Sequence, residues 1–174
     1  MRDYVRRDSV CITQVNYYYD TENLFFNARG ITCRIRKKGQ ELTATIKAHR
    51  PGSKGVSLEH SFPVDKVWDT FPLGSLCLKK MGHLTTIRTV CSPVPGVRTE
   101  LDKNTYLDTI DYELEIEYAP DRATAANCEL NSMAMALFQR GILNDTADFI
   151  QRTGKGNSKS QRFFSAKATI KNKQ

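Results

Sequence analysis

Polar and apolar side chains alternate along several parts of the chain, most regularly over residues 111–118. Period two is the spacing of a β-strand, so the glutamates at 113, 115 and 117 share one face, and the other face carries Tyr112, Leu114, Ile116 and Tyr118. Such a pattern can mark a solvated outer face. However, carboxylates on one face repel each other, so it also predicts a facing cation, either a metal or basic side chains on other strands.

The same alternation predicts further strands over residues 15–19, 31–37, 41–48, 56–62, 84–90 and 97–102. The turn residues at 38–40 and 93–96 predict hairpins between their flanking strands. Residues 65–82 are less periodic and predict short helices capped by Asp65 and Ser75.

A helical spacing of apolar residues predicts a helix from Asp121 to about Arg140, which ends at Gly141. We interpret its stripe as packing; the stripe comprises Ala126, Leu130, Met133, Ala134, Leu137 and Phe138. A short helix is expected over residues 145–151. Residues 154–160 are expected to be a basic, flexible loop, after which Phe163 and Phe164 attach the tail to the body.

Nearly every predicted strand has one polar and one apolar face, which indicates an α+β fold with an antiparallel, closed β-barrel. The helices would cover the apolar outer surface, and residues 1–174 would form one domain. The interior would hold Arg34, Arg36, Lys47, Glu59, Arg88, Glu100, Asp102, Glu113, Glu115 and Glu117. A ring of structural Arg–Glu ion pairs is the alternative, although buried pairs contribute little net stability.

Composition points to an anionic partner, because the formal net charge is +7 and the pI about 9.2. The first ten residues lack the apolar run of a signal peptide, and no segment approaches the roughly 20 apolar residues of a membrane span. The five cysteines are scattered without C-x-x-C spacing, which predicts buried free thiols in a reducing cytoplasm.

The charged interior suggests a ligand class. Arginine forks bind phosphate oxygens bidentately, and a lysine adds a point charge. Carboxylates hold Mg²⁺ or Mn²⁺, which in turn bridges to phosphate. Basic and acidic groups that line one cavity therefore fit a polyphosphate with a divalent metal.

Five segments, taken in order, resemble the CYTH family, the triphosphate tunnel metalloenzymes: residues 16–21 (NYYYDT), 33–36 (CRIR), 45–47 (TIK), 101–103 (LDK) and 112–117 (YELEIE). The resemblance runs from about Val15 to Phe164. It implies an eight-stranded antiparallel tunnel that uses Mg²⁺ or Mn²⁺. Family members hydrolyse inorganic triphosphate, thiamine triphosphate or RNA 5′-triphosphate ends, or cyclise ATP.

The resemblance also implies roles for single residues. The triphosphate-binding set would be Arg34, Arg36, Lys47, Arg88, Lys159, Arg162 and the inward acidic residue Glu59. The metal-binding set would be Asp102, Glu115, Glu117 and, as a supporting group, Glu113. The catalytic set would be Glu115, Glu117, Arg36 and Lys47.

One departure concerns the N-terminus. The family's first strand carries Glu-x-Glu-x-Lys, which residues 1–14 do not contain. We expect that this start is truncated or that the strand has been lost, which would leave an open seam in the barrel, weak metal binding and low activity.

The leading hypothesis is a metal-dependent hydrolase of a triphosphate compound. A non-catalytic polyphosphate-binding or nucleotide-binding module, a nucleotidyl cyclase and a barrel that binds single-stranded nucleic acid are the alternatives. Apart from a 5′-triphosphate end, nucleic acid is the least favoured partner, because a tyrosine run such as residues 17–19 more often packs in a core. No membrane partner is expected, and a homodimer stays open.

Overall fold

The alternating stretches form strands in the computed structural model, which describes residues 9–49, 57–154 and 156–171. Eight strands form one sheet, in the order β4-β3-β2-β1-β6-β7-β8, with β5 paired to β6. The strands are β1 Val10–Asp20, β2 Ile31–Lys38, β3 Glu41–His49, β4 Ser57–Pro63, β5 Thr70–Leu73, β6 Leu76–Val94, β7 Val97–Tyr106 and β8 Thr109–Tyr118. The helices are α1 Ala123–Gln139, α2 Thr146–Gln151 and α3 Lys159–Lys171, with short 3₁₀ turns η1 Asn27–Arg29 and η2 Pro120–Arg122.

This architecture confirms the α+β class and places a strand over each predicted range, but β6 runs from Leu76 to Val94 and so extends well beyond the predicted residues 84–90. Strand β1 begins five residues earlier than predicted, and β4 begins at Ser57, because Val56 lies outside the described residues, as do residues 1–8. Among the described residues the strand order ends at β4 and β8, which do not pair with each other. Closure into a barrel therefore stays a prediction.

Contacts within the chain divide it into two compact units. Unit 1 comprises Met1–Ile12, Ile87–Lys103 and Tyr112–Asn157. Unit 2 comprises Thr13–Thr86, Asn104–Asp111 and Ser158–Gln174. Strands β1, β6, β7 and β8 each contribute residues to both units, and the single-domain organisation stays a prediction.

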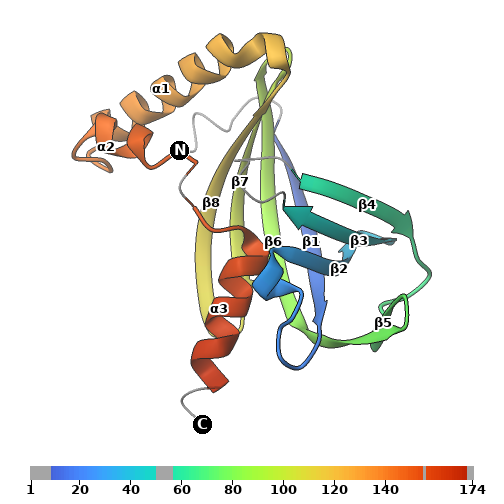
Figure 1. Ribbon diagram of the computed structural model, residues 1–174. Coiled ribbons are helices and arrows are strands. Elements are labelled where there is room, and N and C mark those ends of the chain that lie inside the picture. Colours follow the sequence, from blue (N-terminus) through green and yellow to red (C-terminus); the bar gives the residue numbers. More distant parts are fainter. Residues whose placement is uncertain (1–8, 50–56, 155, 172–174) are drawn as a thin grey trace. The chain divides into compact units, whose positions relative to one another are not determined.

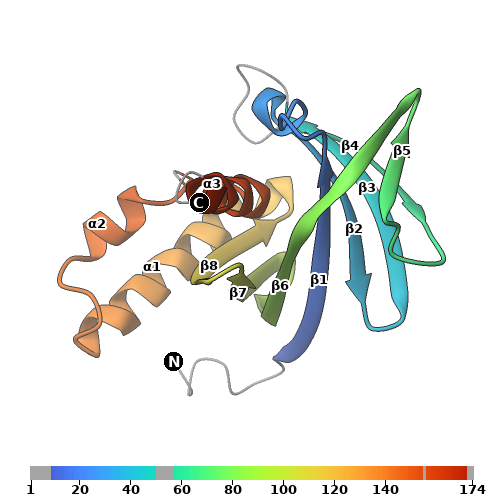
Figure 2. The same ribbon diagram turned by 90° about the horizontal axis from the view of Figure 1, so that it is seen from below.

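Unit 2 contains four neighbouring antiparallel strands, β1 to β4 (Figure 2). Their register gives the strands two chemically different faces. Cross-strand partners share a face, and the register pairs Asn16 with Arg36, Tyr18 with Arg34 and Lys47 with Glu59. We call this surface the polar face of unit 2; it carries Gln14, Asn16, Tyr18, Thr32, Arg34, Arg36, Lys38, Thr43, Thr45, Lys47, Glu59 and Ser61. The predicted separation of polar and apolar side chains is thus present here.

The opposite face of these strands forms an apolar core. Its buried members are Tyr19, Phe26, Cys33, Ile35, Ala44, Phe71 and Leu78. Phe71 and Leu78 come from β5 and β6, and Trp68 packs against the same core, so this face is covered by residues 64–78. The expectation that helices would cover it is wrong.

The short helices predicted for residues 65–82 are also wrong, since β5 and the start of β6 form a hairpin there. Leu73 pairs with Leu76, which leaves Gly74 and Ser75 as a two-residue loop, and Gly74 has φ +59°. A glycine with positive φ at this position is typical of a tight hairpin. The Gly74-Ser75 pair between two apolar segments therefore indicates a hairpin, and it is a better guide to this segment than the candidate helix caps at Asp65 and Ser75.

Residues 159 and 160, predicted as the end of a loop, instead form the start of helix α3. Its start is a capping box, in which Ser158 Oγ accepts from Gln161 N at 3.3 Å and Gln161 Oε1 accepts from Ser158 N at 2.9 Å. The predicted attachment by Phe163 and Phe164 is confirmed, because both are buried in a second core against Tyr18. Phe163 approaches so closely that a Cβ on Gly82 would lie 2.8 Å from its ring.

In unit 1, α1 packs against α2 and η2 (Figure 1). The short helix expected over residues 145–151 is present as α2, and Asp145 caps it by accepting from Ala147 N at 2.8 Å. Ala126 and Ala134 of the predicted stripe are buried, whereas Phe138 is exposed. In the described parts of the chain, no helix has the length and apolar character needed to cross a membrane.

Of the five free cysteines, only Cys33 is buried, so the prediction of buried thiols holds for that residue alone. Burial, with a smaller contribution from Asp20, raises the pKa of Cys33 from 9.0 to about 12. Between these values the unfolded thiol loses its proton while the folded thiol keeps it, so stability falls as pH rises. We expect a contribution of up to about 1.4 kcal/mol per pH unit to that slope.

Urea unfolding between pH 8 and 12 tests this expectation. Cys33→Ala should show a shallower alkaline loss of stability than the wild type, and Cys128→Ala, which alters an exposed thiol, should match the wild-type slope. Equal slopes for all three proteins would contradict it.

Candidate functional site

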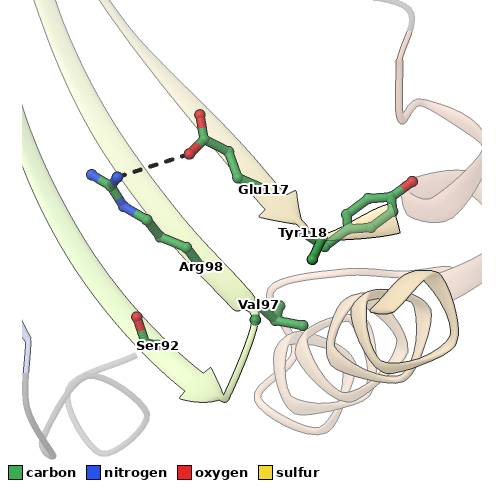
Figure 3. A pocket seen from close by; sticks show the side chains of 7 residues that line it. Ser92, Val97, Arg98, Glu117 and Tyr118 are labelled. Atoms are coloured by element: carbon green, nitrogen blue, oxygen red, sulfur yellow. Dashed lines mark ion pairs between the residues drawn. The ribbon is translucent and has the colours of Figure 1, made fainter. Parts of the chain in front are cut away.

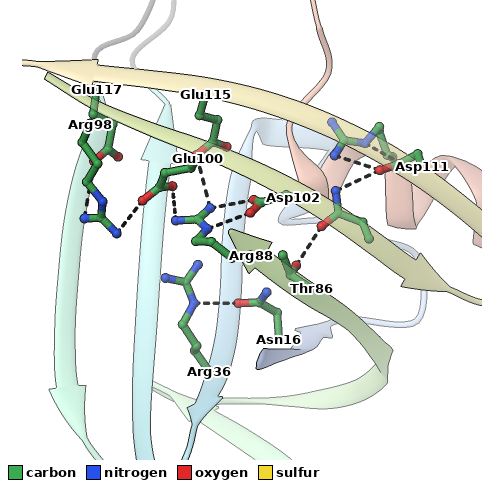
Figure 4. A network of polar contacts seen from close by, with 12 residues as sticks. Asn16, Arg36, Thr86, Arg88, Arg98, Glu100, Asp102, Asp111, Glu115 and Glu117 are labelled. Carbon is green, nitrogen blue, oxygen red and sulfur yellow. Dashed lines mark hydrogen bonds and ion pairs between the residues drawn. The ribbon is translucent and has the colours of Figure 1, made fainter. Parts of the chain in front are cut away.

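Unit 1 contains a cluster of five carboxylates and two arginines on β6, β7 and β8, which we call the acidic cluster (Figure 4). Alternation along β7 and β8 places every second side chain on one face, and this brings the acids together. The members are Arg88, Arg98, Glu100, Asp102, Glu113, Glu115 and Glu117.

Arg88 is surrounded by carboxylates. Its Nε and Nη2 donate to the two oxygens of Asp102 at 2.8 and 2.7 Å, and Nη2 also donates to Glu115 Oε2 at 3.3 Å. Its Nη1 forms an ion pair with Glu100. Burial lowers the pKa of Arg88, but the hydrogen bond and charge of Asp102, with Glu100 and Glu115, raise it above its ordinary value. Arg88 is therefore a fixed positive charge in this cluster.

Glu100 is fully buried, and both of its oxygens contact guanidinium groups. Arg98 Nη2 lies 2.5 Å from Glu100 Oε1, and Arg98 Nη1 lies 3.9 Å from Glu117 Oε2. Neither contact of Glu100 has hydrogen-bond geometry. Burial raises the pKa of Glu100; Arg88 and Arg98 lower it, and Glu117 and Glu115 raise it further.

The acidic cluster has a donor set that fits a divalent cation. Two groups of three carboxylates each offer oxygens within 4.8 Å of one another: Glu100, Glu115 and Glu117, and Asp102, Glu113 and Glu115. Glu115 belongs to both groups. Carboxylate oxygens are ligands that Mg²⁺ and Mn²⁺ prefer, and the five acids outnumber the two arginines among them.

A pocket of about 360 Å³ opens beside this cluster (Figure 3). It is lined by Ser92, Gly96, Val97, Arg98, Glu117, Tyr118 and Ala119. Arg98 and Glu117 belong to both the pocket and the acidic cluster, and their side chains point toward each other. The pocket therefore gives a ligand access to one end of the cluster.

In unit 2, the polar face presents most of the predicted basic residues. Arg36 Nε donates to Asn16 Oδ1 at 2.9 Å. Glu59 forms ion pairs with two basic residues: Arg34 Nη2 lies 3.9 Å from its carboxylate, and Lys47 Nζ lies 3.6 Å from it. Glu59 is thus well placed to align two cations.

The charges of four basic residues of unit 2 act on the buried phenol of Tyr18. Burial raises the pKa of Tyr18, while the charges of Arg34, Arg36, Lys159 and Arg162 oppose that rise. Lys159 is the first residue of α3, and the next residue, Ser160, makes a 2.8 Å hydroxyl contact with Thr32. The start of α3 thereby brings its basic residues to the polar face.

Arg162 is held by a carboxylate that sequence reasoning did not select. Asp111 Oδ2 accepts from Arg162 Nε at 2.9 Å and from the Tyr106 hydroxyl at 2.7 Å. Asp111 Oδ1 accepts from Asn104 Nδ2 at 2.9 Å, and Asn104 Oδ1 accepts from Thr86 (Figure 4). Burial and Asp111 together raise the pKa of Tyr106 to about 12.

The predicted site residues fall into two sets. Unit 2 holds Arg34, Arg36, Lys47, Glu59, Lys159 and Arg162, and unit 1 holds Arg88, Asp102, Glu113, Glu115 and Glu117. Arg88, a predicted triphosphate ligand, forms ion pairs with three carboxylates in this structure, and its role toward triphosphate stays a prediction. Glu100 was placed in the interior but not among the metal ligands. Glu100 lies two residues before Asp102 in β7, and this spacing, which places both side chains on one face, could have identified it as a further metal ligand.

Residues 7–133 match the model of the CYTH domain. The structure is similar to the crystal structure of a candidate adenylate cyclase from Bacillus halodurans, with 25% identity and a TM-score of 0.60. The match covers 88% of this chain and 83% of that one.

Two further structures, with lower sequence identity, share the fold. A candidate adenylyl cyclase from Hippeastrum, described as having a dominant triphosphatase activity, is 19% identical with a TM-score of 0.64, covering 95% of this chain and 88% of that one. A protein from Pyrococcus horikoshii OT3 is 19% identical with a TM-score of 0.50, covering 75% of this chain and 80% of that one. The comparison with curated proteins found no match.

Proposed function

Because the chain belongs to the CYTH domain family, we propose that it is a metal-dependent hydrolase of a triphosphate-containing compound, either inorganic or organic. The observation that carries this proposal is that two sets of three carboxylates lie on neighbouring strands and have Glu115 in common. Five acids on neighbouring strands repel one another, and a divalent cation would relieve that repulsion.

The polar face of unit 2 supplies the proposed phosphate-binding groups. Arg34 and Arg36 offer planar forks that match phosphate oxygens, and Lys47 adds a compact charge. Lys159 and Arg162 approach the same buried phenol as these arginines, which supports their assignment to one anion-binding set. Glu59 orients Arg34 and Lys47 and so positions two members of that set.

The acidic cluster supplies the proposed metal ligands, namely Asp102, Glu113, Glu115, Glu117 and the additional residue Glu100. When bound there, Mg²⁺ or Mn²⁺ would neutralise phosphoryl charge and acidify a bound water.

Hydrolysis would proceed by attack of water on the terminal phosphorus and cleavage of its bridging P–O bond, which yields phosphate and the shortened phosphate compound. Glu117, with an exposed side chain beside the pocket, is the carboxylate that we propose accepts the proton of water. Arg36 and Lys47 would stabilise the negative charge that develops on the phosphoryl oxygens.

A nucleotidyl cyclase is the second candidate, and the similarity to the Bacillus halodurans protein favours it. The same phosphate-binding and metal-binding residues would serve both reactions. A non-catalytic polyphosphate-binding module would use the polar face alone and show affinity without turnover.

Phosphate release from inorganic triphosphate with Mg²⁺ or Mn²⁺ tests the proposal, and conversion of ATP to cyclic AMP tests the cyclase. We expect phosphate release that needs the metal and falls roughly 10-fold or more in Arg36→Ala, because a hydrogen bond to a charged group is lost. Arg36→Lys should recover only part of the rate, since it restores the charge without the fork.

The outcomes separate the candidates. Cyclic AMP formation without triphosphate hydrolysis would favour the cyclase, and triphosphate binding without any turnover would favour the binding module. Metal-independent phosphate release that is unchanged in Arg36→Ala would contradict the hydrolase.

A further inference from the structure

We propose that the side-chain amides of Gln14 and Asn16 on β1 donate hydrogen bonds to phosphoryl oxygens of the bound substrate. This inference rests on the proposed function and extends it to two neutral residues. It would make β1 a part of the phosphate-binding surface, alongside the basic residues of β2 and β3.

The two amides lie on the same face as the arginines. Gln14 and Asn16 are two residues apart in β1, so their side chains share a face. Asn16 is the cross-strand partner of Arg36, and Gln14 is the partner of Lys38. The Arg36–Asn16 hydrogen bond at 2.9 Å confirms that this pair meets on the polar face.

Both amides are buried with a donor left over. Gln14 is 3% exposed and Asn16 is fully buried. Among the described residues, neither Gln14 Nε2 nor Asn16 Nδ2 has a hydrogen-bond acceptor. Burial of an unsatisfied donor is unfavourable, and buried polar groups in folded proteins almost always have a partner. Two such donors on successive positions of one face indicate a partner that is bound from outside the chain.

The surroundings define the chemistry of that partner. The Asn16 oxygen is already engaged by Arg36, so only its NH₂ group remains to bind a ligand. Arg34 and Arg36 are the cross-strand partners of Tyr18 and Asn16 on the same face, and their charges, together with those of Lys159 and Arg162 that act on Tyr18, favour an anion. A ligand that is anionic and rich in hydrogen-bond acceptors meets both conditions, and a triphosphate is both.

Asn16→Asp separates this role from simple positioning of Arg36. The carboxylate keeps the size of the amide and still accepts the Arg36 hydrogen bond. It removes the NH₂ donor and adds a negative charge that repels phosphate. If Asn16 only oriented Arg36, the variant would bind as tightly as the wild type. We expect instead that its Kd for a triphosphate rises roughly 10-fold or more.

Gln14→Met provides a second and independent measurement. Methionine has a similar length and removes the orphaned donor, so the free protein should become more stable, with a midpoint a few degrees higher. Binding should weaken in the same variant. A residue that served only the fold would show the opposite change in stability.

The experiment is calorimetric titration with imidotriphosphate, whose bridging nitrogens resist hydrolysis, in the presence of Mg²⁺, together with thermal unfolding of each free protein. Asn23→Asp, in an exposed turn, controls for the added charge and should bind as the wild type does. Weaker binding by Asn16→Asp and Gln14→Met, with higher stability of Gln14→Met, is the expected result. Unchanged binding in both variants, or a destabilised Gln14→Met with wild-type affinity, would overturn the assignment. No binding by the wild type would instead overturn the proposed function.

Discussion

Replacing Arg88 with methionine is expected to lower the free energy of unfolding by about 3–5 kcal/mol, the usual cost of removing one partner from a buried ion pair. Arg88 is the shared cation of Glu100 and Asp102, which are both fully buried, and of Glu115. Methionine preserves much of the volume of the side chain but none of its charge. Chemical denaturation at pH 7 measures the effect.

Arg98→Met is the matched control. Arg98 also contacts Glu100, but its side chain is 46% exposed, and Glu100 keeps its contact with Arg88 in this variant. We expect a loss of about 1 kcal/mol or less, as for exposed ion pairs. Mn²⁺ should stabilise Arg88→Met more than the wild type, because the freed carboxylates then bind a cation. Equal stabilities of the two variants, or no difference in their response to Mn²⁺, would contradict this account of the cluster.

Replacing Glu115 with glutamine is expected to reduce metal-dependent turnover of triphosphate by at least about 100-fold. Residues that merely support metal ligands cost 10- to 100-fold when removed, and Glu115 is a member of both carboxylate groups. The substitution keeps the shape of the side chain and removes one of the charges that hold the cation. Phosphate release at increasing Mn²⁺ concentrations measures both the rate and the apparent metal affinity.

Glu113→Gln and Asp148→Asn serve as graded controls. Glu113 belongs to only one carboxylate group, so a smaller effect is expected. Asp148 of α2 pairs with Arg152 and belongs to neither group of carboxylates, so its replacement should leave turnover unchanged. A Glu115→Gln enzyme that retains wild-type activity and metal affinity would remove Glu115 from the proposed metal site.

The strands could be predicted from the sequence because a half-buried sheet imposes period two on its side chains. The charged residues of β7 and β8 show this directly, since alternation alone grouped Asp102 with Glu100 and Glu115 with its neighbouring glutamates. The basic residues of β2 and β3 followed from the same rule, and the pairing of Arg34 with Thr45 and of Thr32 with Lys47 agrees with it.

Errors arose where tertiary contacts override local pattern. Residues 65–82 carry apolar side chains without clear alternation, because Phe71 and Leu78 pack against the core from a hairpin. Helix α3 was missed because its first turn is polar, and its position depends on the distant contact of Phe163 with Tyr18. The ion pairs of Arg88 likewise could not be predicted from its own strand, because the neighbouring strand brings Asp102 within reach of its guanidinium.

Neutral residues of the candidate site escaped sequence reasoning for a different reason. Gln14 and Asn16 carry no charge and so lie outside the charge pattern that drew attention to the strands, and Asp111 pairs with an arginine that is distant in sequence. Their importance emerges only from burial and from the hydrogen bonds that they make or lack.

Anomalous diffraction at the manganese edge, from crystals grown with Mn²⁺ and imidotriphosphate, tests the central claim most directly. The account predicts a manganese peak among Asp102, Glu113, Glu115 and their neighbours, with the triphosphate on Arg34 and Arg36. Manganese bound elsewhere, or a triphosphate that leaves both arginines without contact, would contradict it.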